Sequence, residues 1–79
     1  MTPEERVIRA ITRRALTKIA YEKAYAEAQE AKKYATSVAV ILEAGTVMDE
    51  ARNRWHVASA KCDEAIKTIE LLAIARGSA

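Results

Sequence analysis

Residues 4 to 44 contain neither glycine nor proline, and this uninterrupted stretch constrains the fold more than any other feature. The whole chain of 79 residues holds two glycines and one proline. A sheet protein needs several tight turns, which depend largely on these two residue types. The stretch is instead dominated by Ala, Glu, Lys, Arg, Leu and Ile, most of which lose little side-chain freedom in a helix. The sequence therefore predicts an all-α fold.

The first predicted helix has a clear start. Thr2 can serve as its N-cap, Pro3 suits the first helical position, and Glu5 stands at the capping-box position three residues after the cap. No later signal interrupts the helix before Gly45, so we predict one continuous helix. The alternative is a kink or break between residues 13 and 22.

A turn is predicted at residues 44–46. Gly45 can adopt the left-handed conformation that ends a helix, Thr46 can cap the next helix, and Asp49 follows as the acidic partner of that cap. We therefore predict an antiparallel two-helix hairpin that forms a single domain over residues 1–79, with helices over about 3–44 and 47–76.

Both predicted helices carry a stripe of apolar and small residues at alternating steps of three and four, the spacing of a coiled-coil contact. In the second helix the stripe consists of Met48, Ala51, Trp55, Ala58, Cys62, Ala65, Ile69 and Leu72. In the first helix it consists of Tyr21, Ala24, Ala28, Ala31, Ala35, Val38 and Leu42. A turn about Gly45 pairs Leu42 with Met48, Ala35 with Trp55, Ala28 with Cys62 and Tyr21 with Ile69. If the indole is fully buried there, Trp55→Ala costs on the order of 3–5 kcal/mol.

The predicted hairpin leaves many apolar residues outside its two stripes, although a chain of 8.7 kDa can build only a small core. These residues are Val7, Ile8, Ile11, Leu16, Ile19, Tyr34, Val40, Ile41, Val57, Ile66, Leu71 and Ile74. Apolar surface of this extent marks an interaction site, and small helical hairpins usually reach stability by association. We therefore predict a homodimer that closes into a helical bundle, with binding of a different protein as the alternative.

The formal net charge of +2 arises near the N-terminus, because residues 1–23 carry six basic and three acidic side chains. Arg6, Arg9, Arg13 and Arg14 lie on or near one helical face, an arrangement that can follow the phosphates of a nucleic acid. A solvated helix face is the simpler interpretation, since no aromatic residue stands among these arginines to stack on bases. Nucleic acid is therefore the alternative partner.

The sequence offers little for catalysis or ligand chemistry. Its two glycines are 32 positions apart, so there is no glycine-rich phosphate loop. Cys62 lies on the apolar stripe, where a buried inert thiol is expected, and His56 points away from that stripe. Their separation along the helix places the two side chains on different faces, which argues against a Cys–His pair or a local metal site. We predict a non-enzymatic protein with no metal and no cofactor.

We expect the chain in the cytoplasm. No apolar run reaches the length of a membrane span, and the first twenty residues, with five basic side chains and two glutamates, do not resemble a secretory signal. One cysteine cannot form an internal disulfide, which agrees with a reducing compartment. No membrane partner is predicted.

The segment from Glu43 to Ala51, EAGTVMDEA, joins a Tyr- and Ala-rich region to a helix of mixed charge. Over residues 31–72 the sequence resembles short helical-hairpin proteins of bacteriophages. The resemblance implies an origin in a phage or mobile element, where proteins of this size often act by binding a larger machine. It transfers no functional residue.

These features predict a non-enzymatic accessory or inhibitor protein of phage type that binds a larger host or phage protein complex through a helical surface. The alternative is a homodimeric regulator that binds nucleic acid through its N-terminal basic stripe. The residues expected to bind a partner are Arg6, Arg9, Arg13, Arg14, Ile8, Ile11 and Tyr25.

Overall fold

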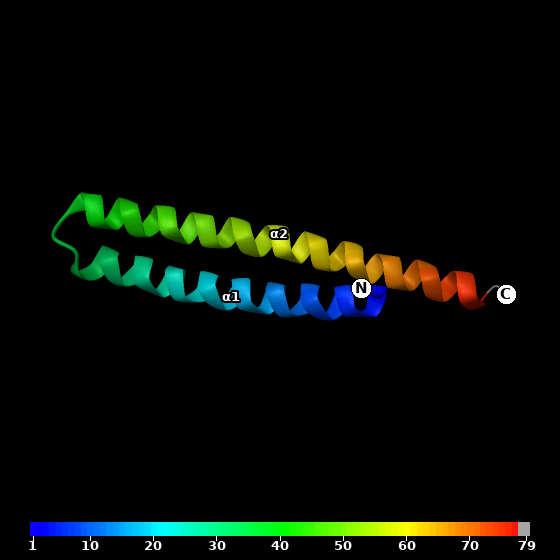
Figure 1. Ribbon diagram of the computed structural model, residues 1–79. Coiled ribbons are helices and arrows are strands. Elements are labelled where there is room, and N and C mark those ends of the chain that lie inside the picture. Colours follow the sequence, from blue (N-terminus) through cyan, green and yellow to red (C-terminus); the bar gives the residue numbers. More distant parts are fainter. Residues whose placement is uncertain (78–79) are drawn as a thin grey trace.

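The computed structural model describes residues 1–77, and its two helices lie side by side as an antiparallel hairpin (Figure 1). Helix α1 spans Pro3–Tyr34 and helix α2 spans Val38–Gly77. The molecule is a rod of 66 × 17 × 13 Å with a radius of gyration of 18.1 Å. A compact domain of this length would have a radius of gyration of about 12 Å. The predicted all-α hairpin is therefore confirmed, in an extended form.

Helix α1 begins as predicted. The Glu5 backbone N–H donates to Thr2 Oγ1 at 3.2 Å, and Pro3 occupies the first helical position. The helix then runs without interruption to Tyr34, so the alternative of a break between residues 13 and 22 is wrong. Figure 1 shows no sharp kink in this part of α1 either.

The turn between the helices lies at residues 35–37, so the predicted turn at residues 44–46 is wrong. Ala35 leaves the helix with an extended backbone, at φ −71° and ψ 136°. Its N–H still donates to the Ala31 carbonyl oxygen at 2.9 Å, which closes the last turn of α1. The first helix is consequently shorter than predicted and the second is longer.

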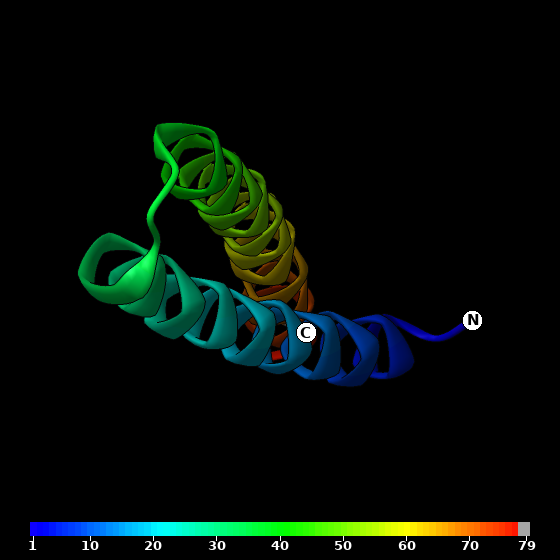
Figure 2. The same cartoon turned by 90° about the vertical axis from the view of Figure 1, so that its left-hand side faces the viewer.

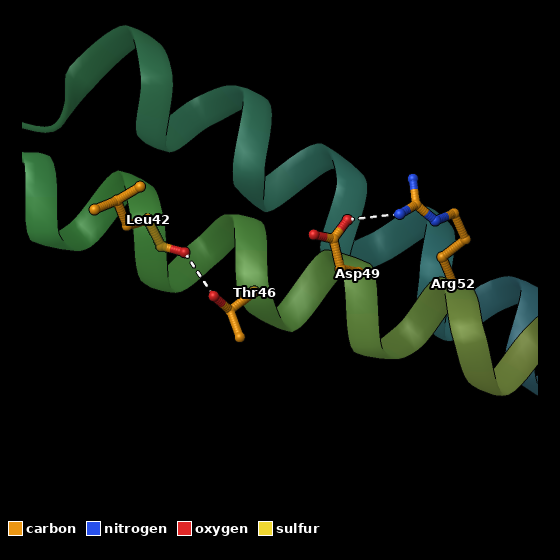
Figure 3. A network of polar contacts seen from close by, with 4 residues as sticks. All are labelled: Leu42, Thr46, Asp49 and Arg52. Carbon is orange, nitrogen blue, oxygen red and sulfur yellow. Dashed lines mark hydrogen bonds and ion pairs between the residues drawn. The ribbon is translucent and has the colours of Figure 1, made fainter.

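The residues predicted to form the turn lie in the interior of α2 (Figure 3). Thr46 Oγ1 donates back to the Leu42 carbonyl oxygen at 3.0 Å, as threonine does in the middle of a helix. Asp49 pairs with Arg52 at 2.9 Å and caps no helix. Gly45 has no positive φ and is an ordinary helical residue. This segment is therefore a helix interior with the sequence of a helix boundary.

The turn at residues 35–37 is favoured because it lets the whole length of α1 pack against α2. With a turn at residues 44–46, the first thirteen residues would have no counterpart in the second helix. In the structure Pro3 and Ala10 line a groove together with Ala65 of α2. A helical glycine costs about 1 kcal/mol relative to alanine. That cost is small beside the gain from packing several more turns of α1, since each buried methylene contributes about 0.8 kcal/mol.

Gly45→Ala is expected to raise the free energy of unfolding by about 0.5–1 kcal/mol. A Cβ atom at this position would meet nothing within 4 Å, and the φ value is one that alanine adopts readily. If Gly45 formed a left-handed turn, the same substitution would destabilise the protein. Urea denaturation followed by circular dichroism therefore distinguishes the two hairpins by the sign of the change.

The helices meet along a continuous seam of buried and half-buried residues. On α2 the seam contains every residue of the predicted stripe from Met48 to Leu72 and continues back to Ile41 and Ala44. On α1 the seam consists of Pro3, Val7, Ala10, Arg14, Thr17, Tyr21, Ala24, Ala28 and Ala31. Val38 and Leu42, predicted on the stripe of the first helix, belong to α2 and are 70% and 65% exposed.

The facing pairs change with the turn. Tyr21 packs on Trp55, with ring centroids 5.5 Å apart. This register brings Ala24 to the level of Ala51. It replaces all four predicted pairs, which are therefore wrong: Leu42 with Met48, Ala35 with Trp55, Ala28 with Cys62 and Tyr21 with Ile69.

The enclosed core is small and is made of small side chains. It consists of Ala24, Ala28, Ala51, Ala58 and Cys62. Alanine on both helices lets the two backbones approach closely, while Tyr21 and Trp55 fill the layer between alanine layers. Figure 2, which looks along the rod from the turn, shows the helices inclined to each other.

Candidate functional site

The seam divides the surface of the hairpin into two sides. Residues two positions apart on a helix point about 200° apart. Arg6 and Ile8 of α1 therefore flank the seam on opposite sides, as do Thr68 and Ile66 of α2. One side carries an apolar groove and the other a basic groove, so the residues predicted to bind a partner do not form one surface.

The apolar groove lies between the beginning of α1 and the later part of α2. Its lining consists of Val7 and Ile8 from α1 and Ile66 and Ile69 from α2, together with Glu4 and Glu70. Ile8 is 64% exposed, and Ile11, about one turn further along α1, is 42% exposed. The structure thus brings two predicted partner-binding residues, Ile8 and Ile11, to the side that carries Ile66 of α2.

An aromatic cluster continues this side of the hairpin toward the turn. Tyr25 is 46% exposed, and its ring centroid lies 6.2 Å from that of Tyr21. Trp55, on which Tyr21 packs, stacks in turn on His56 with 5.4 Å between ring centroids. Tyr25, the third predicted apolar contact, is therefore the exposed end of a cluster of rings contributed by both helices. His56 lies on the surface, as predicted.

The basic groove is defined by Arg6 and Arg13 of α1 and by Arg54 and Lys61 of α2. Lys61 borders both of its adjoining parts, and all four side chains are exposed. Glu64 is the one acidic residue in the lining of the two parts. Within residues 1–77 the ion pair joins Asp49 to Arg52, so none of the four cations of the groove is paired with a carboxylate.

The other two predicted arginines lie outside the basic groove. Arg9 is exposed on α1 but does not line the groove. Arg14 is half-buried in the seam, at the level of Cys62 in the register that joins Tyr21 to Trp55. The structure therefore keeps Arg6 and Arg13 together and adds two cations from α2 that the spacing along one helix could not reveal.

Cys62 is 0% exposed and is a free cysteine, which confirms the predicted buried thiol. A sulfur enclosed in this way has no access to a substrate or a metal ion. No group of three His, Cys, Asp or Glu side chains in the described part of the chain is placed to hold a metal ion. Neither α1 nor α2, as far as residue 77, combines the length and hydrophobicity needed to cross a membrane.

Comparison with protein-family models, with curated proteins and with solved structures finds no match to this chain. The two grooves are therefore the features of the chain that bear on its function.

Proposed function

We propose that this chain is a non-enzymatic interaction protein, an accessory or inhibitor protein that binds a larger protein complex through the apolar side of its hairpin. The observation that carries the proposal is the extent of exposed surface. The chain exposes 6149 Å². A monomeric protein of 8.7 kDa is expected to expose about 4,700 Å², which leaves an excess of roughly 1,400 Å². Each partner in a standard interface contributes about 800 Å².

The apolar character of this surface supports a protein partner. The exposed residues Ile8, Ile11 and Tyr25 lie on this side, next to the groove residues Ile66 and Ile69 of α2. Apolar surface contributed by two neighbouring helices usually marks a protein contact. The groove between Ile8 and Ile66 offers the apolar face of another helix a place to pack, as in helix-in-groove recognition. The burial of Cys62, the strongest nucleophile in the chain, supports a non-enzymatic role.

The first partner that we propose is a second copy of the chain. The enclosed core of four alanines and one cysteine contributes little hydrophobic free energy to a chain of 79 residues. Two hairpins packed through their apolar sides would bury the isoleucines of both grooves and form a four-helix bundle. A larger protein that uses the same side would compete with this dimer.

Size-exclusion chromatography with light scattering tests the homodimer. At tens of micromolar the wild-type chain is expected to have twice the monomer mass of 8.7 kDa. The double variant Ile11→Gln/Ile66→Gln removes one apolar side chain that lines the groove, Ile66, and one beside it, Ile11, and is expected to be monomeric. The control Leu16→Gln/Leu71→Gln removes exposed apolar side chains that do not line the apolar groove and is expected to stay dimeric. A strictly monomeric wild type contradicts the homodimer and leaves a different protein as the partner.

Binding of a larger protein is tested with the same variants as bait in extracts of the native host. The expected result is a protein retained by the wild type and by Leu16→Gln/Leu71→Gln but lost with Ile11→Gln/Ile66→Gln. If the groove variant retains every protein that the wild type retains, the apolar side does not bind the complex and the proposal fails.

The setting that we propose is a phage or mobile element acting in the host cytoplasm. It rests on the resemblance of residues 31–72 to phage helical hairpins, although residues 43–51 form the interior of α2 and no turn. The lone cysteine also suits a reducing compartment. The proposed binding function does not depend on this setting.

A further inference from the structure

The basic groove takes no part in the proposed protein contact, because it lies across the seam from the apolar groove. We propose that it binds the phosphate backbone of a double-stranded nucleic acid. This inference goes beyond the function proposed above and is independent of the apolar side.

The groove brings like charges together. Arg13 of α1 and Arg54 and Lys61 of α2 line the same part of it, and that part contains no carboxylate. Residues that flank the seam of a helical pair usually carry opposite charges and form salt bridges between the helices. Three unpaired cations in one groove instead create a positive potential that attracts an anion. The charge pattern therefore serves a ligand better than it serves the stability of the hairpin.

The cations also form a row along the rod. Arg6 and Arg13 are seven residues apart on α1, as are Arg54 and Lys61 on α2, and seven helical residues span about 10.5 Å. Because Lys61 borders both parts of the groove, the row extends over roughly 20 Å from Arg6 to Arg54. A duplex presents one phosphate per ~3.4 Å of its axis along each strand. A row of this length suits an extended polyanion and exceeds what one small anion can contact.

The groove has no surface on which unpaired bases could stack. The lining of its two parts contains no aromatic side chain. The rings of Tyr21 and Trp55 pack on each other within the seam, and Tyr25 extends them on the apolar side. Proteins that bind single strands combine cations with aromatic rings, whereas contacts to phosphates alone are typical of duplex binding without sequence preference. The geometry therefore favours a duplex.

Fluorescence anisotropy with labelled duplex DNA and duplex RNA, titrated at several salt concentrations, tests the proposal. Binding of either duplex supports it, and the duplex that binds identifies the natural source of the phosphates. The logarithm of affinity is expected to fall against the logarithm of salt concentration with a slope of about −3 to −4 for four phosphate contacts. Arg13→Ala/Lys61→Ala is expected to lower affinity at least about tenfold and to make the slope less steep by about two.

The matched control is Lys33→Ala/Lys67→Ala, which removes one exposed cation from each helix outside the groove and gives the same net charge. It is expected to bind nearly as the wild type does, and circular dichroism checks that every variant remains helical. Arg54→Ala provides an independent groove variant, with a slope less steep by about one. Equal losses for the two double variants overturn the proposal. So does absence of duplex binding at roughly 100 μM protein in low salt, or preferential binding of single strands, acidic peptides or anionic vesicles.

Discussion

Replacing Trp55 by alanine is expected to lower the free energy of unfolding by about 2–3 kcal/mol. The indole belongs to the seam, packs on Tyr21 with 5.5 Å between ring centroids and stacks on His56. Truncating a fully buried tryptophan costs about 3–5 kcal/mol. Trp55 is half-buried, so only part of that loss applies. The loss is still large for this chain because four of the five enclosed residues are alanine.

Urea denaturation followed by circular dichroism measures this effect. The protein concentration is held fixed, because self-association would make the apparent stability depend on it. For a domain of this size, the loss corresponds to a melting temperature lower by roughly 10–20 °C. The control His56→Ala removes the exposed ring at the end of the cluster opposite Tyr25 and is expected to cost less than about 1 kcal/mol.

The register supplies a second control for the same prediction. Combining Tyr21→Ala with Trp55→Ala is expected to show a coupling energy of about 0.5–1.5 kcal/mol, since the two rings pack on each other. In a hairpin with its turn at residues 44–46, Tyr21 would face Ile69 and the coupling would be close to zero. A cost below about 0.5 kcal/mol for Trp55→Ala, or no coupling, would contradict the packing described here.

The stripes could be predicted from the sequence because they depend on each helix separately. The alternation of steps from Met48 to Leu72 keeps these residues on one face wherever the chain folds back. The same holds from Tyr21 to Ala31 on α1. Which residues face each other depends on the position of the turn, and periodicity carries no information about that position.

Local signals alone place the turn incorrectly. Gly45 and Thr46 have the residue types of a helix boundary, yet both lie within α2. Weaker signals stand at the true boundary: Lys32 and Lys33 complement the dipole in the last turn of α1, and Ser37 directly precedes α2. The position of the turn is decided by packing along the full length of α1. That packing depends on both helices, so local sequence signals do not reveal it.

The basic groove could not be predicted from the sequence either, because it depends on how the two helices are aligned. Arg13 and Lys61 are far apart in the sequence and come to one groove only through the register of the two helices. The seam position of Arg14, in contrast, could have been predicted from the spacing of residues along α1. Extending the alternation of α1 backwards from Tyr21 through Thr17 reaches Arg14, which is therefore a seam position and not part of a surface stripe.

Ala58→Leu is expected to lower the free energy of unfolding by about 2–3 kcal/mol, the upper part of the range for overpacking. Ala58 is 3% exposed and lies beside Thr17 at the base of the basic groove. A leucine has no space between backbones that alanine layers hold close together, so the helices must separate or the side chain must adopt a strained rotamer. Separation would also loosen the neighbouring contact between Tyr21 and Trp55. If the two helices were farther apart, the leucine would fill empty space and raise the free energy of unfolding.

Ala60→Leu is the matched control, because the same substitution on an exposed position of the same turn is expected to change stability by less than about 0.5 kcal/mol. Reaction of Cys62 with a thiol reagent gives a second readout. The enclosed thiol reacts only when the hairpin opens, so Ala58→Leu is expected to speed labelling and Ala60→Leu to leave it unchanged. A more stable Ala58→Leu with a protected thiol would mean that the backbones are farther apart than described. Faster labelling together with lower stability, at unchanged helix content, assigns the loss to the close approach of the helices and not to helix formation.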